Sequence, residues 1–120
     1  MITIYHNPRC SKSRNALNAI QNSQKEFKIV EYLTDLFTEE TLSLLLKKMN
    51  IKPEELVRKN ESVFLEKFKG KSFKDSEWIK ILVENPKLIQ RPIVLTNSRA
   101  LVARDEQTIE TILKDNSEKK

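Results

Sequence analysis

The chain has 120 residues, with 22 Lys and Arg against 17 Asp and Glu, so its formal net charge is +5. This length corresponds to about one domain that can bury a core without disulfides, and we expect a single domain over residues 1–120 with a polar, frayed tail over residues 114–120. The moderate positive charge suits an anionic ligand without requiring nucleic acid, and a single cysteine excludes both an intramolecular disulfide and a metal site built from several thiolates.

The sequence also indicates the cellular compartment in which the protein is expected. The chain begins directly with the apolar run Ile2 to Tyr5, with no basic region before it, and no apolar run approaches the ~20 residues that span a membrane. One unpaired cysteine is typical of a reducing compartment. We therefore expect a soluble, cytoplasmic protein with no bound metal or cofactor.

The first third of the chain has the pattern of a β-strand, a helix and a second strand. Ile2 to Tyr5 is β-branched and aromatic, as in a buried strand. Apolar residues then recur at helical spacing between Ser13 and Ser23, and Phe27 to Tyr32 is strand-like again. Elements of these lengths favour a right-handed βαβ unit with parallel strands.

The middle of the chain is predicted to be helical. Four segments are expected, beginning at Thr38, Pro53, Asn60 and Asp75, each with a residue type that favours a helix start. The third segment ends at Gly70, the only glycine, where a left-handed conformation is expected, and the fourth is stopped by Asn85-Pro86.

The last part of the chain has a hairpin pattern followed by a helix. Residues 90–95 and 100–103 are strand-like, and the turn between them has no glycine, so Asn97 or a neighbour must supply any positive φ. Asp105 is placed to cap a final helix that carries Ile109, Ile112 and Leu113. The predicted order is thus βαβ, a helical insert, then ββα.

The only cysteine, Cys10, lies between the first strand and the first helix. Backbone N–H groups without helical partners and the positive end of the helix dipole are expected there, and Arg9, Lys12 and Arg14 add cations. Settings of this kind lower thiol pKa values from ~8.5 to between ~3.5 and ~7.5. The same N–H groups can bind an oxyanion. A free cysteine that only fills space is the alternative, but the polar and cationic surroundings favour a nucleophile.

Several motifs in order resemble the glutaredoxin-dependent arsenate reductase family. The residues that carry the resemblance are His6-Asn7-Pro8-Arg9-Cys10-Ser11-Lys12-Ser13-Arg14, Leu56-Val57-Arg58-Lys59-Asn60, Asn85-Pro86, Arg91-Pro92-Ile93-Val94 and Arg104. The match runs from Ile2 to about Leu113. It implies an α/β, thioredoxin-like fold with a mixed four-stranded sheet and a helical insert between the second and third strands.

The resemblance also implies a set of site residues. Cys10 would attack arsenate, three arginines would bind the oxyanion, two residues would polarise or activate the thiol, and one proline would be cis. In this chain the arginines are Arg58, Arg91 and Arg104, the activating residues are His6 and Ser13, and the cis proline is Pro92. We add Arg14 as a further cation for substrate binding. Arginine suits this task because its guanidinium stays charged and binds oxyanions with two hydrogen bonds.

One thiol cannot complete a two-electron reduction, so an external thiol is expected. The resemblance implies glutathione as co-substrate and glutaredoxin as partner, with arsenite as product. The chain departs from resistance-type members, which have small residues beside the cysteine, since it has Arg9 before Cys10 and Ser11-Lys12 after it.

Two other functions are compatible with the sequence. A generic thiol oxidoreductase would exchange disulfides with glutathione without using arsenic. A non-catalytic regulator is the other, because the same fold family includes Spx-like transcriptional regulators that bind RNA polymerase. Redox-sensing regulators of that kind use a C-x-x-C pair, and the matching second position here is Ser13. A nucleic-acid-binding module is disfavoured, because basic and aromatic residues do not interleave on one predicted face.

Overall fold

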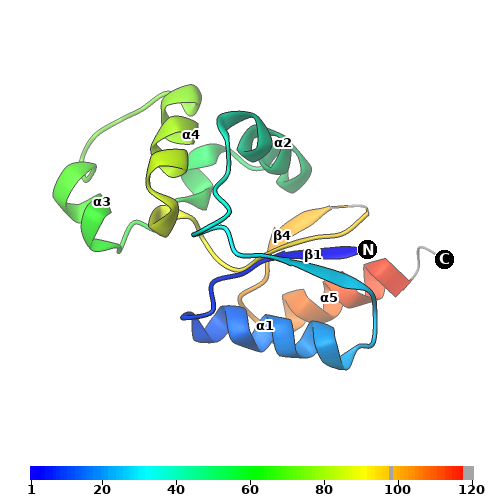
Figure 1. The fold of residues 1–120 in the computed structure, drawn as a ribbon. Helices are drawn as coiled ribbons and strands as arrows, with labels where there is room; N and C mark the ends of the chain where they lie inside the picture. Colours follow the sequence, from blue (N-terminus) through cyan, green and yellow to red (C-terminus); the bar gives the residue numbers. More distant parts are fainter. Residues whose placement is uncertain (98, 118–120) are drawn as a thin grey trace. The chain divides into compact units, whose positions relative to one another are not determined.

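The structure is a computed structural model that describes residues 1–97 and 99–117. The chain forms two compact units (Figure 1). One consists of Met1–Asp35 and Arg91–Lys120, and the other is Leu36–Gln90. The second unit coincides with the helical insert that the sequence predicts, while the prediction of a single domain stays a prediction. In the part of the chain that the structure describes, no helix is long and apolar enough to cross a membrane.

The first unit is built on a mixed four-stranded sheet. Its strands are β1 (Ile2–Tyr5), β2 (Phe27–Val30), β3 (Ile93–Leu95) and β4 (Ala100–Val102), in the order β2-β1-β3-β4. β1 pairs with β2 in parallel, and the pairs β1·β3 and β3·β4 are antiparallel. β4 therefore runs in the same direction as β1. This is the thioredoxin-like arrangement that the family resemblance implies.

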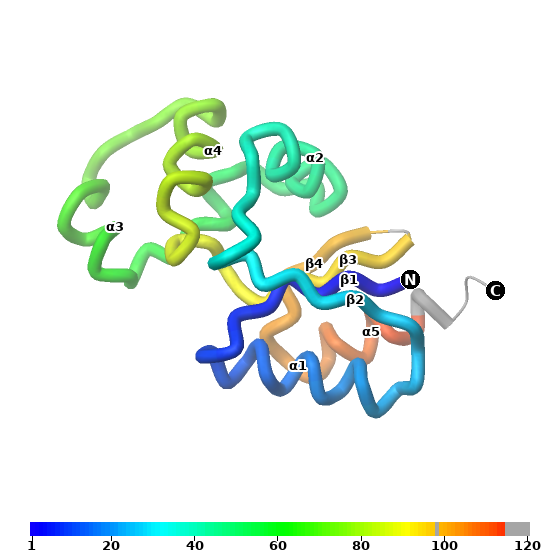
Figure 2. The backbone as a smooth tube through the Cα atoms, viewed as in Figure 1, coloured from blue at the N-terminus to red at the C-terminus, as the bar shows by residue number. Residues whose placement is uncertain are grey.

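Two helices, α1 (Ser11–Asn22) and α5 (Glu106–Ser117), lie side by side in this unit on one face of the sheet (Figure 2). Apolar side chains of both helices meet those of the strands in one buried core. Its members include Ile2, Ile4, Ala16, Ile20, Val94, Ala103, Ile109 and Ile112. Because α1 follows β1 and α5 follows β4, both helices begin at the same edge of the sheet. The loop that carries Cys10 lies at this edge.

The second unit contains only helices. They are α2 (Glu39–Met49), the 3₁₀ turn η1 (Pro53–Leu56), α3 (Ser62–Lys67), α4 (Asp75–Glu84) and the 3₁₀ turn η2 (Pro86–Leu88). Thr38 caps α2 as predicted, since its hydroxyl accepts the Thr41 N–H at 3.1 Å and Thr41 Oγ1 accepts the Thr38 N–H in return. Trp78 of α4 stacks on Phe64 with the ring centroids 6.4 Å apart, and this joins α3 to α4.

Most predicted boundaries are confirmed, including the left-handed Gly70 with φ 79° and the Asp105 cap, whose carboxylate accepts the Thr108 N–H at 2.7 Å. Asn97 does not have a positive φ, and Ser98 lies outside the described residues. α5 continues to Ser117, residues 118–120 lie outside the described residues, and the predicted fraying of residues 114–120 stays a prediction.

Three predicted boundaries were wrong by a few residues, each for a local reason. β2 ends at Val30 rather than residue 32, because Glu31 O accepts backbone N–H groups in a turn over residues 31–35. The N-cap of α3 is Glu61 rather than residue 60, because residues 58–61 form a turn of their own. β3 begins only at Ile93, because Pro92 has no N–H to pair and the Gln90 N–H bonds to Leu56 O instead.

Candidate active site

The loop between β1 and α1 is held by hydrogen bonds to the backbone carbonyl and the side-chain amide oxygen of Asn7. Asn7 O accepts the Cys10 N–H at 3.0 Å, and Asn7 Oδ1 accepts the Arg9 N–H at 3.0 Å. Cys10 O then accepts the Arg14 N–H at 3.0 Å, which is the first hydrogen bond of α1. Cys10 is accordingly the N-cap residue of α1, with extended backbone angles. The structure thus places the thiol at the start of the first helix, as the sequence predicts.

Charged and polar groups around the thiol change its acidity. Burial raises the pKa of Cys10, but the Ser13 N–H, a hydrogen bond from the Arg91 guanidinium and the Lys12 N–H lower it, and the net pKa is below the ordinary value. The helix start and Arg91 thus both favour the thiolate, which is the form that acts as a nucleophile.

His6 and Ser13 form a buried pair behind the thiol loop. His6 Nδ1 lies 2.6 Å from Ser13 Oγ, and Ser13 Oγ also accepts the Asn7 N–H at 3.0 Å. His6 is 5% exposed and Ser13 is fully buried. Burial lowers the pKa of His6, Glu31 raises it and Arg14 lowers it, so that the net pKa is below the ordinary value of 6.5. A neutral imidazole can accept a hydrogen bond from the Ser13 hydroxyl at Nδ1.

Ser13 therefore acts on the thiol through its backbone, while its side chain fixes the loop. Its N–H lowers the pKa of Cys10, and its hydroxyl connects His6 to Asn7. This arrangement makes His6 and Ser13 residues that hold the loop and its helix start in place. Their predicted role in activating the thiol stays a prediction.

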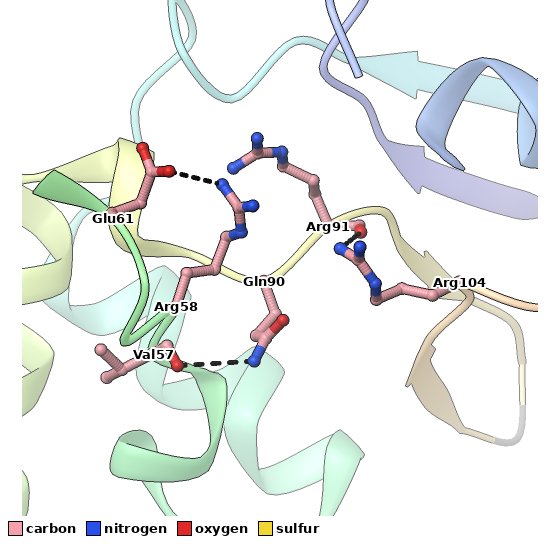
Figure 3. A network of polar contacts seen from close by, with 6 residues as sticks. All are labelled: Val57, Arg58, Glu61, Gln90, Arg91 and Arg104. Atoms are coloured by element: carbon pink, nitrogen blue, oxygen red, sulfur yellow. Dashed lines mark hydrogen bonds and ion pairs between the residues drawn. The ribbon is translucent and has the colours of Figure 1, made fainter. Parts of the chain in front are cut away.

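Arg91 and Arg104 meet at the same edge of the sheet as Cys10. Arg104 Nη1 donates to Arg91 O at 3.1 Å (Figure 3). The peptide bond between Arg91 and Pro92 is cis, as the resemblance implies, and Pro92 O accepts the Ala103 N–H at 2.8 Å. The structure thus brings two of the three predicted arginines together, one of them in contact with the thiol.

Arg58 belongs to the second unit, and its predicted place in the anion site stays a prediction. Its backbone N–H donates to Leu88 O at 2.7 Å, and its Nη1 forms an ion pair with Glu61 Oε2 at 3.0 Å (Figure 3). Nearby, Gln90 Nε2 donates to Val57 O at 3.4 Å. This ion pair is partly buried, with the Arg58 side chain 14% and the Glu61 side chain 28% exposed.

Arg14 has a structural contact in place of a contact with the thiol. Its Nη1 donates to Pro8 O at 2.9 Å, which ties α1 to the loop that precedes Cys10. Its predicted part in substrate binding stays a prediction. Among residues 1–97 and 99–117, no cluster of three His, Cys, Asp or Glu side chains could hold a metal ion.

Two residues that shape the site were not predicted from the sequence. Asn7 was quoted only as part of a motif, although its N–H, carbonyl and amide oxygen all shape the loop. An Asn before a proline is a known turn former, so the signal was present. Glu61 was also missed, although its spacing of three residues from Arg58 could have suggested the ion pair.

Comparison with known proteins agrees with the fold and identifies the family. Residues 5–112 match the family model described as the ArsC family. The chain is 38% identical over 115 residues to the arsenate reductase of Escherichia coli (strain K12), covering 95% of this chain and 82% of that protein. It is 39% identical over 114 residues to the uncharacterized protein YfgD of the same organism, covering 92% and 96%.

A solved structure shows the same similarity in three dimensions. The arsenate reductase from Vibrio cholerae superimposes with a TM-score of 0.82 and 32% sequence identity, covering 94% of this chain and 95% of that chain. A similarity of this extent covers most of both units. The chain therefore belongs to the ArsC family.

Proposed function

We propose that this protein reduces arsenate to arsenite, with Cys10 as the nucleophile and an external thiol as the reductant. The observation that carries the proposal is that the Arg91 guanidinium lowers the pKa of the Cys10 thiol, so that an oxyanion-binding group lies beside the nucleophile and favours its thiolate form. Membership of the ArsC family and 38% identity to an arsenate reductase support the choice of substrate.

The site suits a tetrahedral oxyanion for electrostatic reasons. Arg91 and Arg104 supply two permanent positive charges, and the N–H groups of Lys12 and Ser13 at the start of α1 supply further donors. Arginine can bind two oxygens of one anion at once, which fixes the arsenic atom relative to the sulfur. Arg58 is the third arginine that we assign to the anion, and its ion pair with Glu61 would open on binding.

The proposed reaction has two covalent steps. In the first, the Cys10 thiolate attacks arsenic, an S–As bond forms, and one arsenate oxygen leaves as water after it takes up protons. Arsenic remains pentavalent at this stage. In the second, an external thiolate attacks Cys10 sulfur, an S–S bond forms, and the electron pair of the S–As bond stays on arsenic. Arsenite leaves, and the two electrons have come from two sulfur atoms.

The mixed disulfide left on Cys10 requires another thiol to restore the enzyme. Cys10 is the only cysteine, so the second sulfur must come from outside the chain. We propose glutathione for the first external thiol and a glutaredoxin for the release of the mixed disulfide, in a reducing, cytoplasmic setting. A protein that exchanges disulfides with glutathione but does not reduce arsenate is the alternative that the test must exclude.

The test is to follow arsenite formation by the purified protein with arsenate, glutathione and glutaredoxin. Cys10→Ser should abolish arsenite formation, because a hydroxyl remains protonated at neutral pH and is a poor nucleophile. Ser11→Ala is the matched control, since Ser11 is the adjacent residue, exposed, at the first position of α1. Glutathione oxidation that proceeds equally without arsenate would favour the generic thiol oxidoreductase instead.

A further inference from the structure

A groove of about 620 Å³ lies in the first unit, lined by residues of α1, α5 and the segment before α5. Its volume is within the range of about 300–1,000 Å³ for small-ligand sites. The two helices lie side by side in Figure 2 and begin at the same edge of the sheet. The groove therefore has one end at the helix starts, next to the active site, and runs away from that end along the helices.

The α1 wall of the groove is lined by asparagine side chains. Asn15, Asn18 and Asn22 all line it, together with the small residue Ala19. Their spacing of three and four residues puts the three amides in one row on the helix surface. Each amide offers two N–H donors and one carbonyl acceptor. A row of such groups matches a ligand that itself has peptide groups, because it can both donate to carbonyls and accept from N–H groups.

The α5 wall carries acidic side chains. Glu106 and Glu110 line the groove one helical turn apart, and both are exposed. Two carboxylates at this spacing favour an ammonium group and disfavour a long polyanion. A nucleic acid or a polyphosphate does not fit this wall.

The end of the groove at the helix starts carries two cations beside the carboxylates of Asp105 and Glu106. It is lined by Lys12, which follows Cys10 by two residues, and by Arg104, which donates to the carbonyl of Arg91. Asp105 also lines this end, but its carboxylate accepts the Thr108 N–H at 2.7 Å, and its pKa is lowered by hydrogen bonds from Thr108 and by the charge of Lys12. Lys12 and Arg104 are thus placed to bind a carboxylate.

Length gives a further constraint on the ligand. The row from Lys12 to Asn22 extends about 15 Å along the helix axis, at 1.5 Å per residue. An extended tripeptide is about 10 Å long. A tripeptide with a carboxylate at one end and an ammonium group farther along could therefore bind in the groove from the cationic end to the acidic wall.

We propose that this groove binds the thiol co-substrate, and that its ligand is a short zwitterionic thiol peptide of the glutathione type. One carboxylate lies at Lys12 and Arg104, the peptide groups lie along the asparagine row, and the ammonium group lies farther along, beside Glu110. The inference rests on the proposed function, because it assigns a place to the external thiol of that reaction. The groove would hold the thiol peptide on the two helices that begin near Cys10 before its thiol attacks.

Binding is tested apart from chemistry with S-methylglutathione, which has no free thiol and cannot react. Calorimetric titration of the full chain should show binding, and Asn18→Ala should weaken it about fivefold, since one net hydrogen bond is worth about 1 kcal/mol. Glu110→Lys should weaken it at least as much, because a cation would then face the ammonium group. Gln21→Ala and Glu26→Lys are the matched controls, since neither residue lines the groove, and both should bind as the wild type does.

Kinetics provide the second measurement. Asn18→Ala and Glu110→Lys should raise KM for glutathione while leaving KM for arsenate unchanged, and both variants should keep the wild-type rate with 2-mercaptoethanol, which has no peptide groups. Equal binding of S-methylglutathione by wild type and both variants, or no binding at millimolar concentration, would overturn the groove proposal. Neither result would contradict the proposed reduction of arsenate. Selective binding in the groove with no arsenite formed from any thiol would overturn the proposed function and keep the groove as a peptide-binding site.

Discussion

Replacing Ser13 with alanine should destabilise the protein by about 2–5 kcal/mol. Ser13 Oγ is fully buried, accepts the Asn7 N–H at 3.0 Å and contacts His6 Nδ1 at 2.6 Å. Alanine leaves two buried polar groups without this partner, and each such group costs about 1–3 kcal/mol. The better helix propensity of alanine returns at most about 0.5 kcal/mol. The loss of hydrogen bonds therefore outweighs the propensity gain.

The assay is urea unfolding at pH 7, with Ser11→Ala as the control. Ser11 is exposed and begins the same helix, so its replacement should change the free energy of unfolding by less than about 0.5 kcal/mol. Ser13→Ala keeps the backbone N–H that lowers the pKa of Cys10, so the pH dependence of thiol alkylation should stay close to that of the wild type. A Ser13→Ala protein as stable as Ser11→Ala would refute the assigned network of His6, Ser13 and Asn7.

Three more predictions concern acidity and packing. The iodoacetamide alkylation rate of Cys10 should have its midpoint below the pH of an ordinary thiol, and Arg91→Met should raise that midpoint; coincident midpoints would contradict the contact between Arg91 and the thiol. Because the pKa of buried His6 is lowered, the unfolded state takes up a proton that the folded state does not, so the free energy of unfolding should fall as pH drops below about 6.5, by up to about 1.4 kcal/mol per pH unit. His6→Gln should flatten this dependence, and equal slopes would exclude the buried neutral imidazole. Ile20→Ala should cost about 2–5 kcal/mol in urea unfolding because Ile20 is 1% exposed in the core, whereas Leu44→Ala, at a side chain 55% exposed, should cost less than about 0.5 kcal/mol.

The element order was predictable because the spacing of apolar residues agreed, along most of the chain, with the residue types that begin and end helices and strands. Thr38, Pro53 and Asp75 each begin the helical segment that they were expected to begin, and Gly70 has the expected left-handed conformation. Where the prediction was off, a backbone hydrogen bond outside the element decided the boundary, as for the turn over residues 31–35 that ends β2. These bonds join residues only three and four positions apart, but the turn has no glycine, proline or asparagine to mark it in the sequence.

The candidate site was only partly predictable. The thiol at a helix start could be read from Cys10 and its neighbours, because that arrangement is local. The contact of Arg91 with Cys10 joins residues 81 positions apart, and it entered the prediction only through resemblance to a family. The loop contacts of Asn7 and the pairing of Glu61 with Arg58 were not predicted, although both are formed over six residues or fewer. The groove between α1 and α5 depends on how two distant helices pack, which no local pattern specifies.

The most direct test of the central claim is single-turnover reduction of arsenate by the wild-type protein and by Cys10→Ser, with glutathione in excess and arsenite measured as product. Wild-type protein should form arsenite and carry glutathione on Cys10 as a mixed disulfide, detectable by intact mass, and Cys10→Ser should do neither. Wild-type protein with a reactive Cys10 thiolate that forms no arsenite, or arsenite formed equally by Cys10→Ser, would contradict the assignment of Cys10 as the nucleophile of an arsenate reductase.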